Sequence, residues 1–324
     1  MWEYLIYVCF IATLGSCVIL RLLKLNTKWD RSPTCLVGKT TIVTGANSGI
    51  GFYTAQEFAK RGARVILACR NITRAEEAKI KIVEATKNNN VHVRIVDFAS
   101  LKSIREFAKG INGSEERLDI LVNNAGVIIS KNETTVDGLS KSMQVNHFGP
   151  FLLTLLLIEL IKKSKPSRIV NITSASAKYA RINVNDLNFY SDSLISKITL
   201  LNYANTKLCN ILFTNELSRR LRGSGVTVNS VHPGIVHTGI ARHLNATAQQ
   251  VYECFKYLFK TGEEGAQTSI YVALSKEIEY VTGEYFSNCD IAILPCTAND
   301  AMLAKSVWNR SAELVKLREN EYSL

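Results

Sequence analysis

The chain has 324 residues, of which 47% are hydrophobic and 21% are charged, a balance that excludes a disordered protein. Its formal net charge is +11, but the basic residues form no run with interleaved aromatic residues, so we expect no nucleic-acid partner; an anionic membrane surface and a phosphate-bearing ligand suit this charge better. The eight cysteines form no CxxC pair, and His147, His232 and His237 have no metal-ligand spacing, so we expect a reducing compartment, structural histidines and no metal site.

The N-terminal segment differs in composition from the rest of the chain. Residues 4–20 carry no charge, and Arg21, Lys24, Lys28 and Arg31 follow them. A helix of this length spans about 26 Å, close to the ~27 Å hydrocarbon thickness of an endoplasmic-reticulum bilayer. We predict a retained membrane anchor over residues 1–25, since the alternative, a cleaved signal peptide, needs a basic segment ahead of the apolar one. The basic flank predicts a single-pass protein of this membrane whose remaining domain faces the cytosol.

After a polar linker over residues 26–37, short β-branched runs alternate with longer helical patterns. The runs predicted as strands are residues 40–44, 63–68, 91–96, 119–124, 167–173, 226–231 and 283–286. The helical patterns cover about 51–61, 73–87, 103–108, 138–163 and 198–222, with a further amphipathic stretch over 246–260. This alternation predicts a doubly wound parallel sheet with helices on both faces, a single Rossmann-type α/β domain over residues 38–324.

A glycine-rich turn follows the first predicted strand. The sequence TGANSGIG places Gly45, Gly49 and Gly51 between that strand and a helix. Such a turn lets backbone N–H groups approach a pyrophosphate, and the helix N-terminus adds a partial positive charge. Because the turn opens a strand–helix–strand unit, it predicts a bound dinucleotide.

The end of the second predicted strand bears on the choice of cofactor. The strand VILACRN ends in Cys69, Arg70 and Asn71, without the carboxylate that binds the ribose 2′-hydroxyl of NAD. Arg70 offers a permanently charged partner for a 2′-phosphate, which predicts NADP(H); the alternative is a solvated surface arginine. Asp97, after the third strand, either reaches the adenine amino group or caps the next turn.

Four later residues form the candidate chemical site. Tyr203 and Lys207 lie four residues apart on a predicted helix and so share a face, Ser174 ends an apolar strand, and Asn146 lies in QVNHFGPF. Reduction of a carbonyl needs a proton donor at oxygen, and a phenol with a pKa near ~10 is a weak one. Lys207 is placed to lower that pKa, and Ser174 to hold the substrate oxygen. The set predicts hydride transfer between a cofactor and a carbonyl or alcohol.

These motifs, in this order, resemble the short-chain dehydrogenase/reductase family. They are TGANSGIG, NNAG at 123–126, the serine after the fifth strand, YxxxK, and HPGIVHT at 232–238. The segments ACRN, NHFGPFLL, EGAQTS and GEYFSNC are similar to its retinol dehydrogenase branch, which includes N-terminally anchored microsomal retinal reductases. The similarity runs over about residues 38–315. The chain departs from the branch at Pro150, where relatives commonly carry histidine, and at Thr173, where they often carry serine.

The resemblance implies a role for each candidate residue. Tyr203 is the catalytic acid/base, Lys207 also contacts the nicotinamide ribose, Ser174 orients the substrate oxygen, and Asn146 supports a proton-relay water. The residues implied at the pyrophosphate are Gly45, Ser48, Gly49 and Ile50. The residues implied along the rest of NADP(H) are Arg70 at the 2′-phosphate, Asn124 near the adenosine ribose, and Pro233, Gly234 and Thr238 beside the nicotinamide carboxamide.

Substrate choice falls on two segments without motifs, residues 175–194 and 235–260. The second carries an apolar set consisting of Val251, Tyr252, Phe255, Tyr257, Leu258 and Phe259. That set can close over an apolar ligand, dock on a bilayer or pack on the sheet. Together with the anchor it predicts a lipophilic substrate. The resemblance implies retinal or retinol; an isoprenoid or steroid fits the same chemistry, and a non-catalytic cofactor-binding scaffold is the remaining alternative. Relatives also often dimerise through the helices at 138–163 and 198–222.

Overall fold

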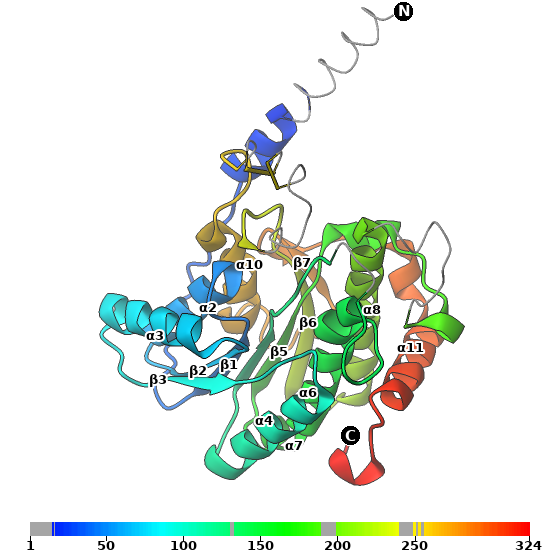
Figure 1. Cartoon of the computed structure of the whole chain (residues 1–324). Coiled ribbons are helices and arrows are strands. Elements are labelled where there is room, and N and C mark those ends of the chain that lie inside the picture. The colour runs from blue at the N-terminus through cyan, green and yellow to red at the C-terminus, as the bar shows by residue number, and fades with distance from the viewer. Residues whose placement is uncertain are drawn as a thin grey trace, which may run out of the picture.

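A computed structural model describes residues 17–129, 133–188, 199–239 and 256–324, together with residues 15, 249, 250, 252 and 253. At its centre lies an eight-stranded sheet with the order β3-β2-β1-β4-β5-β6-β7-β8 (Figure 1). Its strands are β1 (Thr40–Thr44), β2 (Arg64–Cys69), β3 (Val91–Ile95), β4 (Ile120–Asn123), β5 (Ser167–Ile172), β6 (Val226–His232), β7 (Tyr285–Ser287) and β8 (Asp290–Ile291). Neighbours from β3 to β7 are parallel, which confirms the predicted doubly wound sheet, and β8 pairs antiparallel with β7.

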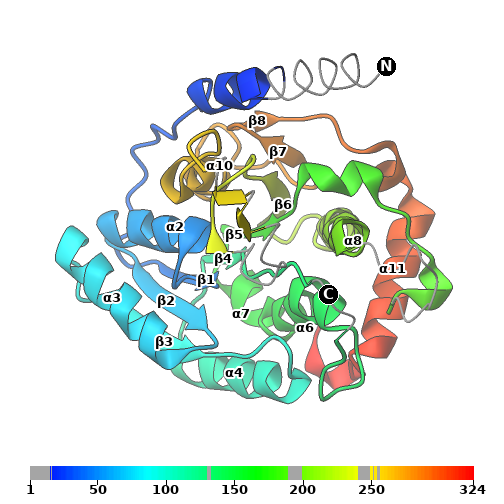
Figure 2. The same cartoon turned by 45° about the horizontal axis from the view of Figure 1, so that its top comes forward.

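Helices cover both faces of the sheet (Figure 2). On one face lie α2 (Gly49–Lys60), α3 (Ile72–Thr86) and α10 (Gly262–Leu274). On the other lie α4 (Leu101–Ser114), α6 (Gly149–Leu156), α7 (Ile158–Lys163) and α8 (Thr199–Arg220). The C-terminal helix α11 (Ala301–Leu314) packs outside α8. The helical patterns predicted from the sequence do not include α10 or α11.

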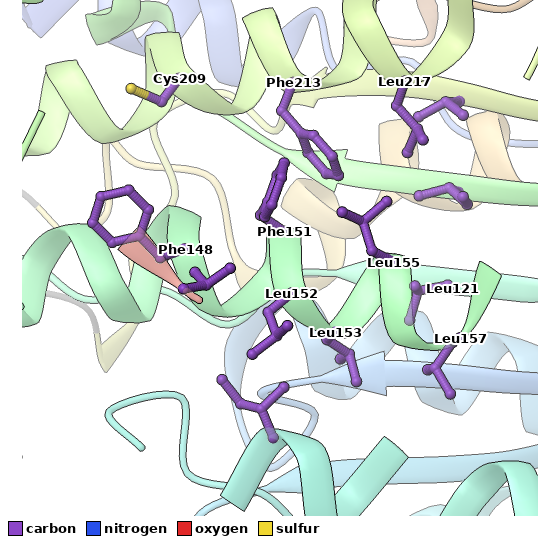
Figure 3. Close-up of a cluster of buried hydrophobic side chains, with 14 of the residues drawn as sticks. Leu121, Phe148, Phe151, Leu152, Leu153, Leu155, Leu157, Cys209, Phe213 and Leu217 are labelled. Carbon is purple, nitrogen blue, oxygen red and sulfur yellow. The ribbon is translucent and has the colours of Figure 1, made fainter. Parts of the chain in front are cut away.

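The alternation of side chains along the buried strands builds two cores. On β4, Leu121 belongs to the core beneath α4, α6 and α8, whereas Val122 belongs to the core beneath α2 and α10. In the first core Phe151 on α6 faces Phe213 on α8, with ring centroids 5.1 Å apart (Figure 3). Both faces of β4 are therefore apolar, as expected for parallel strands that helices cover on both sides.

The prediction of one continuous helix over 138–163 is wrong. The structure has a short helix α5 (Lys141–Met143), a π-helical turn (Gln144–Phe148), then α6 and, after Leu157, α7. The reason lies in Pro150, which has no N–H to donate four residues back. The Gly149 N–H instead donates to the Gln144 carbonyl, five residues back, so the helix widens by one residue at this point.

The segment before β1 lies against the domain. Lys28 Nζ lies 3.0 Å from Asp290 Oδ2, and Asp30 Oδ2 lies 2.8 Å from Arg61 Nη2. Residues 17–25 are helical, while most of the predicted anchor lies outside the described residues. Among the helices that are described, none is both long enough and apolar enough to cross a bilayer.

Candidate active site

A cavity of about 660 Å³ opens at the carboxyl ends of the parallel strands. Its walls include the turns that follow β1, β2, β4, β5 and β6, so side chains far apart in sequence meet there. The order β2-β1-β4 reverses the direction of winding between β1 and β4, and such a switch point is where α/β sheets bind ligands. In the described part of the chain, no group of three His, Cys, Asp or Glu side chains is arranged to hold a metal.

The glycine-rich turn lines one end of the cavity. Gly45 has a φ of 66°, and a Cβ there would lie 3.0 Å from the Ala125 Cα. A Cβ at Gly51 would lie 2.4 Å from the Asn124 Nδ2, which donates to the Thr44 carbonyl at 2.7 Å. Glycine is therefore required for the turn to approach the end of β4. The prediction that Asn124 also contacts the adenosine ribose is untested, although the residue lines the cavity.

The start of α2 suits an anionic group. Ser48, Gly49 and Ile50 line the cavity, and the first turn of α2 has no acidic residue that would offset the positive end of the helix. Within the described residues, the Ser48 hydroxyl makes no capping bond to the helix, which leaves it available to a ligand. The residues present here fit the pyrophosphate of a dinucleotide.

Arg70 and Asp97 lie at the cavity rim beyond β2 and β3. Arg70 is exposed there, and the neighbouring Asn71 caps α3 by accepting a hydrogen bond from the Arg74 N–H at 2.9 Å. The Asp97 carboxylate accepts from the Ala99 N–H at 3.0 Å, so it does cap the following turn, one of its two predicted roles. Its place on the cavity wall leaves the adenine contact a prediction.

Ser174, Tyr203 and Lys207 meet on the cavity wall, as their pattern predicts. Ser174 follows β5, and α8 presents Tyr203 and Lys207 on one face. The Ser174 hydroxyl forms a hydrogen bond with the Tyr203 phenol. The Lys207 Nζ lies 5.3 Å from the centroid of the Tyr203 ring and donates to the Ile172 carbonyl at 3.0 Å. The serine, the phenol and the ammonium thus surround one small volume.

Burial sets the ionisation of these groups. It raises the pKa of the Tyr203 phenol well above its ordinary value; the hydrogen bond from Ser174 acts in the opposite sense, and Tyr252 adds a further rise. Burial lowers the pKa of Lys207 to about 8. Tyr203 is therefore protonated at neutral pH and can act as a proton donor. The further expectation that Lys207 lowers the Tyr203 pKa stays a prediction.

Asn146 is buried behind Gly126 and Lys207, in the π-helical turn. Its Oδ1 accepts from the Val127 N–H at 2.8 Å, and its Nδ2 donates to the Val127 carbonyl at 2.9 Å and the Thr206 hydroxyl at 3.2 Å. Both polar atoms of the side chain are thus engaged in holding the cavity wall.

The loop after β6 closes the cavity beside the glycine-rich turn. Pro233, Gly234 and Thr238 line it, and a Cβ at Gly49 would lie 3.0 Å from the Thr238 Cγ2. The Tyr252 hydroxyl accepts from the Thr238 N–H at 3.0 Å and donates to the loop at the Val236 carbonyl, 2.9 Å away. Of the predicted apolar set, Tyr252 therefore lies at the cavity and stabilises this loop.

Other members of that apolar set have different surroundings. Tyr257 is exposed, and the Phe259 ring packs 5.2 Å from the Tyr252 ring, centroid to centroid. Val251 and Phe255 lie outside the described residues.

Two further polar residues lie near the site: His232, predicted as a structural histidine, and Asn210, which sequence reasoning missed. His232 lines the cavity, and its Nδ1 accepts from the Ala175 N–H at 3.2 Å, which holds the turn that begins at Ser174. Asn210 lies three residues after Lys207, and its Nδ2 donates to the Asn146 carbonyl at 2.9 Å. The helical spacing from Lys207 could have indicated Asn210 as a residue of the same inner face.

Comparison with known proteins gives the class of this protein. The family model described as short chain dehydrogenase matches residues 39–249, so the chain belongs to the short-chain dehydrogenase/reductase family and is an oxidoreductase that uses a nicotinamide cofactor. Mouse retinol dehydrogenase 11 is 45% identical over 87% of this chain and 88% of its own length. Human retinol dehydrogenase 12 is 42% identical over 89% and 90%, and human retinol dehydrogenase 13 is 44% identical over 88% and 87%. These relatives place the chain in the retinol dehydrogenase branch.

Solved structures agree on the fold. An uncharacterized protein from Mycobacterium paratuberculosis is 30% identical and superposes with a TM-score of 0.72 over 90% of this chain and 98% of its own. A short chain dehydrogenase from Shigella flexneri, solved as a complex with NADP, superposes with a TM-score of 0.62 over 79% and 99% at 23% identity, which is a likeness of fold alone.

Proposed function

We propose that this protein interconverts retinal and retinol with NADP(H), by hydride transfer at a site made of Ser174, Tyr203, Lys207 and Asn146. The observation that carries the reaction is the meeting of the first three side chains at the cavity. The substrate is proposed from the retinol dehydrogenase relatives, which are 42–45% identical over most of the chain. The apolar wall of the cavity at Val127, Ile128 and Ile129 suits a lipophilic molecule of this kind.

The end of β2 supports NADP(H) as the cofactor. Arg70 lies on the cavity rim, where a guanidinium can pair with a 2′-phosphate. Within the described residues, the carboxylates lining the cavity are those of Asp97 and Glu133, neither of which follows β2. Nothing at that position therefore offers NAD the carboxylate that its ribose hydroxyls bind.

The mechanism follows from the ionisation of the site. The bound nicotinamide supplies the hydride for reduction or accepts it for oxidation. In reduction, the protonated Tyr203 phenol donates to the substrate oxygen, which the Ser174 hydroxyl holds by a second hydrogen bond. The Lys207 ammonium then stabilises the phenolate that remains. We assign to Asn146 the support of the water that returns a proton to Tyr203.

We further propose that residues 1–25 anchor the protein in the endoplasmic-reticulum membrane, with the catalytic domain over residues 38–324 in the cytosol. The uncharged segment and its basic flank support this assignment. Protease added to sealed microsomes should then digest the domain, whereas protection of the domain would place it in the lumen. A homodimer remains a prediction; because α11 packs on α8, an interface at that helix would have to include α11.

The proposed reaction is tested with membranes that contain the full-length chain or its Tyr203→Phe variant. We expect all-trans-retinal to drive oxidation of NADPH in preference to NADH, and the variant to lose this activity, because phenylalanine keeps the ring and removes the proton. The specificity constant for retinal should exceed those for farnesal and a keto-steroid. Equal or better turnover of farnesal or the steroid would move the assignment to that substrate. Cofactor binding without any turnover would favour the non-catalytic scaffold.

A further inference from the structure

A row of buried polar groups joins the active site to the C-terminal helix. The Asn210 Nδ2 donates to the Asn146 carbonyl at 2.9 Å, and the Asn210 Oδ1 lies 3.0 Å from the His147 Nδ1. The His147 Nε2 lies 2.8 Å from the Ser311 Oγ on α11. All four residues are at most 6% exposed. Water therefore does not complete these bonds, and each group depends on its protein partner.

The partners fix the orientation of the Asn210 amide. Its donor end faces the Asn146 carbonyl, so its oxygen accepts from His147, which must carry a proton on Nδ1. Burial lowers the pKa of His147 to about 4, so the imidazole is neutral. Its Nε2 lies 2.8 Å from the Ser311 Oγ, whose hydroxyl donates to the Val307 carbonyl at 2.7 Å. Turning the amide around would place two acceptors, its oxygen and the Asn146 carbonyl, against each other.

Pro150 explains why the Asn146 carbonyl needs a side-chain donor. Asn146 lies in the π-helical turn that ends at Phe148. Pro150 has no N–H, so it can serve neither the Asn146 carbonyl, four residues back, nor the Val145 carbonyl, five residues back. A buried carbonyl without a donor costs about 1–3 kcal/mol. Asn210, one turn after Lys207 on α8, supplies the donor that the helix lacks.

We propose that Asn210 is a positioning residue of the active site, held in orientation by His147. It ties α8 to the π-helical turn and so keeps the Asn146 side chain on Val127, beside Lys207. The role of Asn210 in catalysis rests on the proposed hydride transfer. The coupling of Asn210 to Asn146 and Pro150 is a separate claim, with a readout of its own.

The test compares Asn210→Leu with the double variant Asn210→Leu/Pro150→Ala. Leucine removes the donor, so we expect kcat to fall by at least about tenfold, with the KM for NADPH unchanged because Asn210 lies behind the cavity wall. Alanine at 150 provides a backbone N–H within reach of the Asn146 carbonyl at the end of the π-helical turn, so the double variant should recover most of the lost kcat. If Asn210→Leu does not fold, Asn210→Asp replaces it, since aspartate keeps the acceptor toward His147 and removes the donor.

Asn215→Leu is the matched control, because Asn215 also lies on α8 and its Nδ2 donates to a main-chain carbonyl, that of Ala298, at 2.8 Å. We expect it to lower the melting temperature without lowering kcat and without rescue by Pro150→Ala. The proposal is overturned if Asn210→Leu keeps the wild-type kcat, or if Pro150→Ala restores none of the loss.

Backbone hydrogen exchange separates this inference from the proposed reaction. Exchange over residues 144–152 should rise in Asn210→Leu and return toward wild type in the double variant, whether or not any substrate is turned over. An unchanged exchange rate in Asn210→Leu contradicts the inference even if retinal is reduced. A wild-type protein that reduces no carbonyl contradicts the proposed function and leaves the exchange result to decide the inference.

Discussion

The Lys207 ammonium on α8 donates to the main-chain carbonyl of Ile172 on β5, at 3.0 Å. Ile172 precedes Ser174 by two residues, so this bond joins the helix that carries Tyr203 to the strand end that carries Ser174. The lysine therefore sets the distance between the phenol and the serine hydroxyl, in addition to any effect of its charge.

Replacement of this lysine tests both effects. Lys207→Met keeps the length of the side chain and removes its charge and its bond to Ile172, so we expect kcat to fall by at least about 100-fold. Lys102→Met on the exposed face of α4 should leave kcat unchanged. Steady-state kinetics with saturating cofactor measure both variants. A Lys207→Met protein within threefold of wild type would show that the ammonium has no part in the chemistry.

The cofactor preference depends on Arg70. Arg70→Ala should raise the KM for NADPH by about 10-fold to 100-fold, the range expected when one charge-assisted hydrogen bond is lost, and leave the KM for NADH nearly unchanged. Lys79→Ala on α3 is the control, because it removes a cation that does not line the cavity. Equal effects of Arg70→Ala on the two cofactors would identify Arg70 as a surface charge.

Two histidines, the buried His147 and the half-buried His232, predict how stability varies with pH. Burial lowers the pKa values of His147 and His232 to about 4, whereas a histidine in the unfolded chain titrates near ~6.5. As the pH falls from about 6.5 toward 4, the unfolded chain takes up protons that the folded protein does not. The free energy of unfolding therefore decreases, by about 3 kcal/mol for each histidine at pH 4.

His147→Gln removes one of these two contributions. Urea unfolding at pH 7 and pH 4.5 should show a smaller loss of stability on acidification in this variant than in wild type, by about 2 kcal/mol. The comparison uses the difference between the two pH values, because the substitution also changes the stability at pH 7. An identical difference in both proteins would contradict a buried neutral imidazole.

The core under α6 predicts a large effect at Phe151. This side chain is fully buried and packs against Phe213 and Trp308, with ring centroids 5.1 Å from each. Phe151→Ala should lower the free energy of unfolding by about 3–5 kcal/mol, since it removes buried apolar surface and leaves a cavity. Met302→Ala on α11, where the side chain is 80% exposed, should change it by less than about 0.5 kcal/mol. Denaturant titration followed by circular dichroism measures both.

Features that depend on neighbours in sequence could be predicted. The glycine-rich turn at Gly45, and the pair Tyr203 and Lys207, carry their geometry within a few residues, and the structure brings them to one cavity. The strands can also be predicted from the sequence, because apolar β-branched runs are short and end at turn residues. The strand β1 has the bounds that its sequence predicts.

Features that depend on distant partners could not be predicted. The break in the helix before α6 follows from Pro150, but the compensating donor, Asn210, comes from another helix 60 residues on. Ser311 and His147 are even further apart in the sequence, and no local sequence pattern predicts their contact. The helix α10 starts with a capping box at Thr261 and Glu264. This signal is local, but it lies outside the regular alternation of strands and helices from which the fold is predicted.

The contacts of Lys28 and Asp30 hold the segment that follows the helical residues 17–25 against the domain. The Asn288 side chain donates to the Asn26 carbonyl at 3.0 Å, and the Lys24 Nζ donates to the Tyr257 carbonyl at 3.2 Å. Hydrogen bonds thus tie the helical residues 17–25 and the segment that follows them to the catalytic domain. A bilayer that held the proposed anchor would therefore also determine how far the cavity opening lies from the membrane surface and how it is tilted.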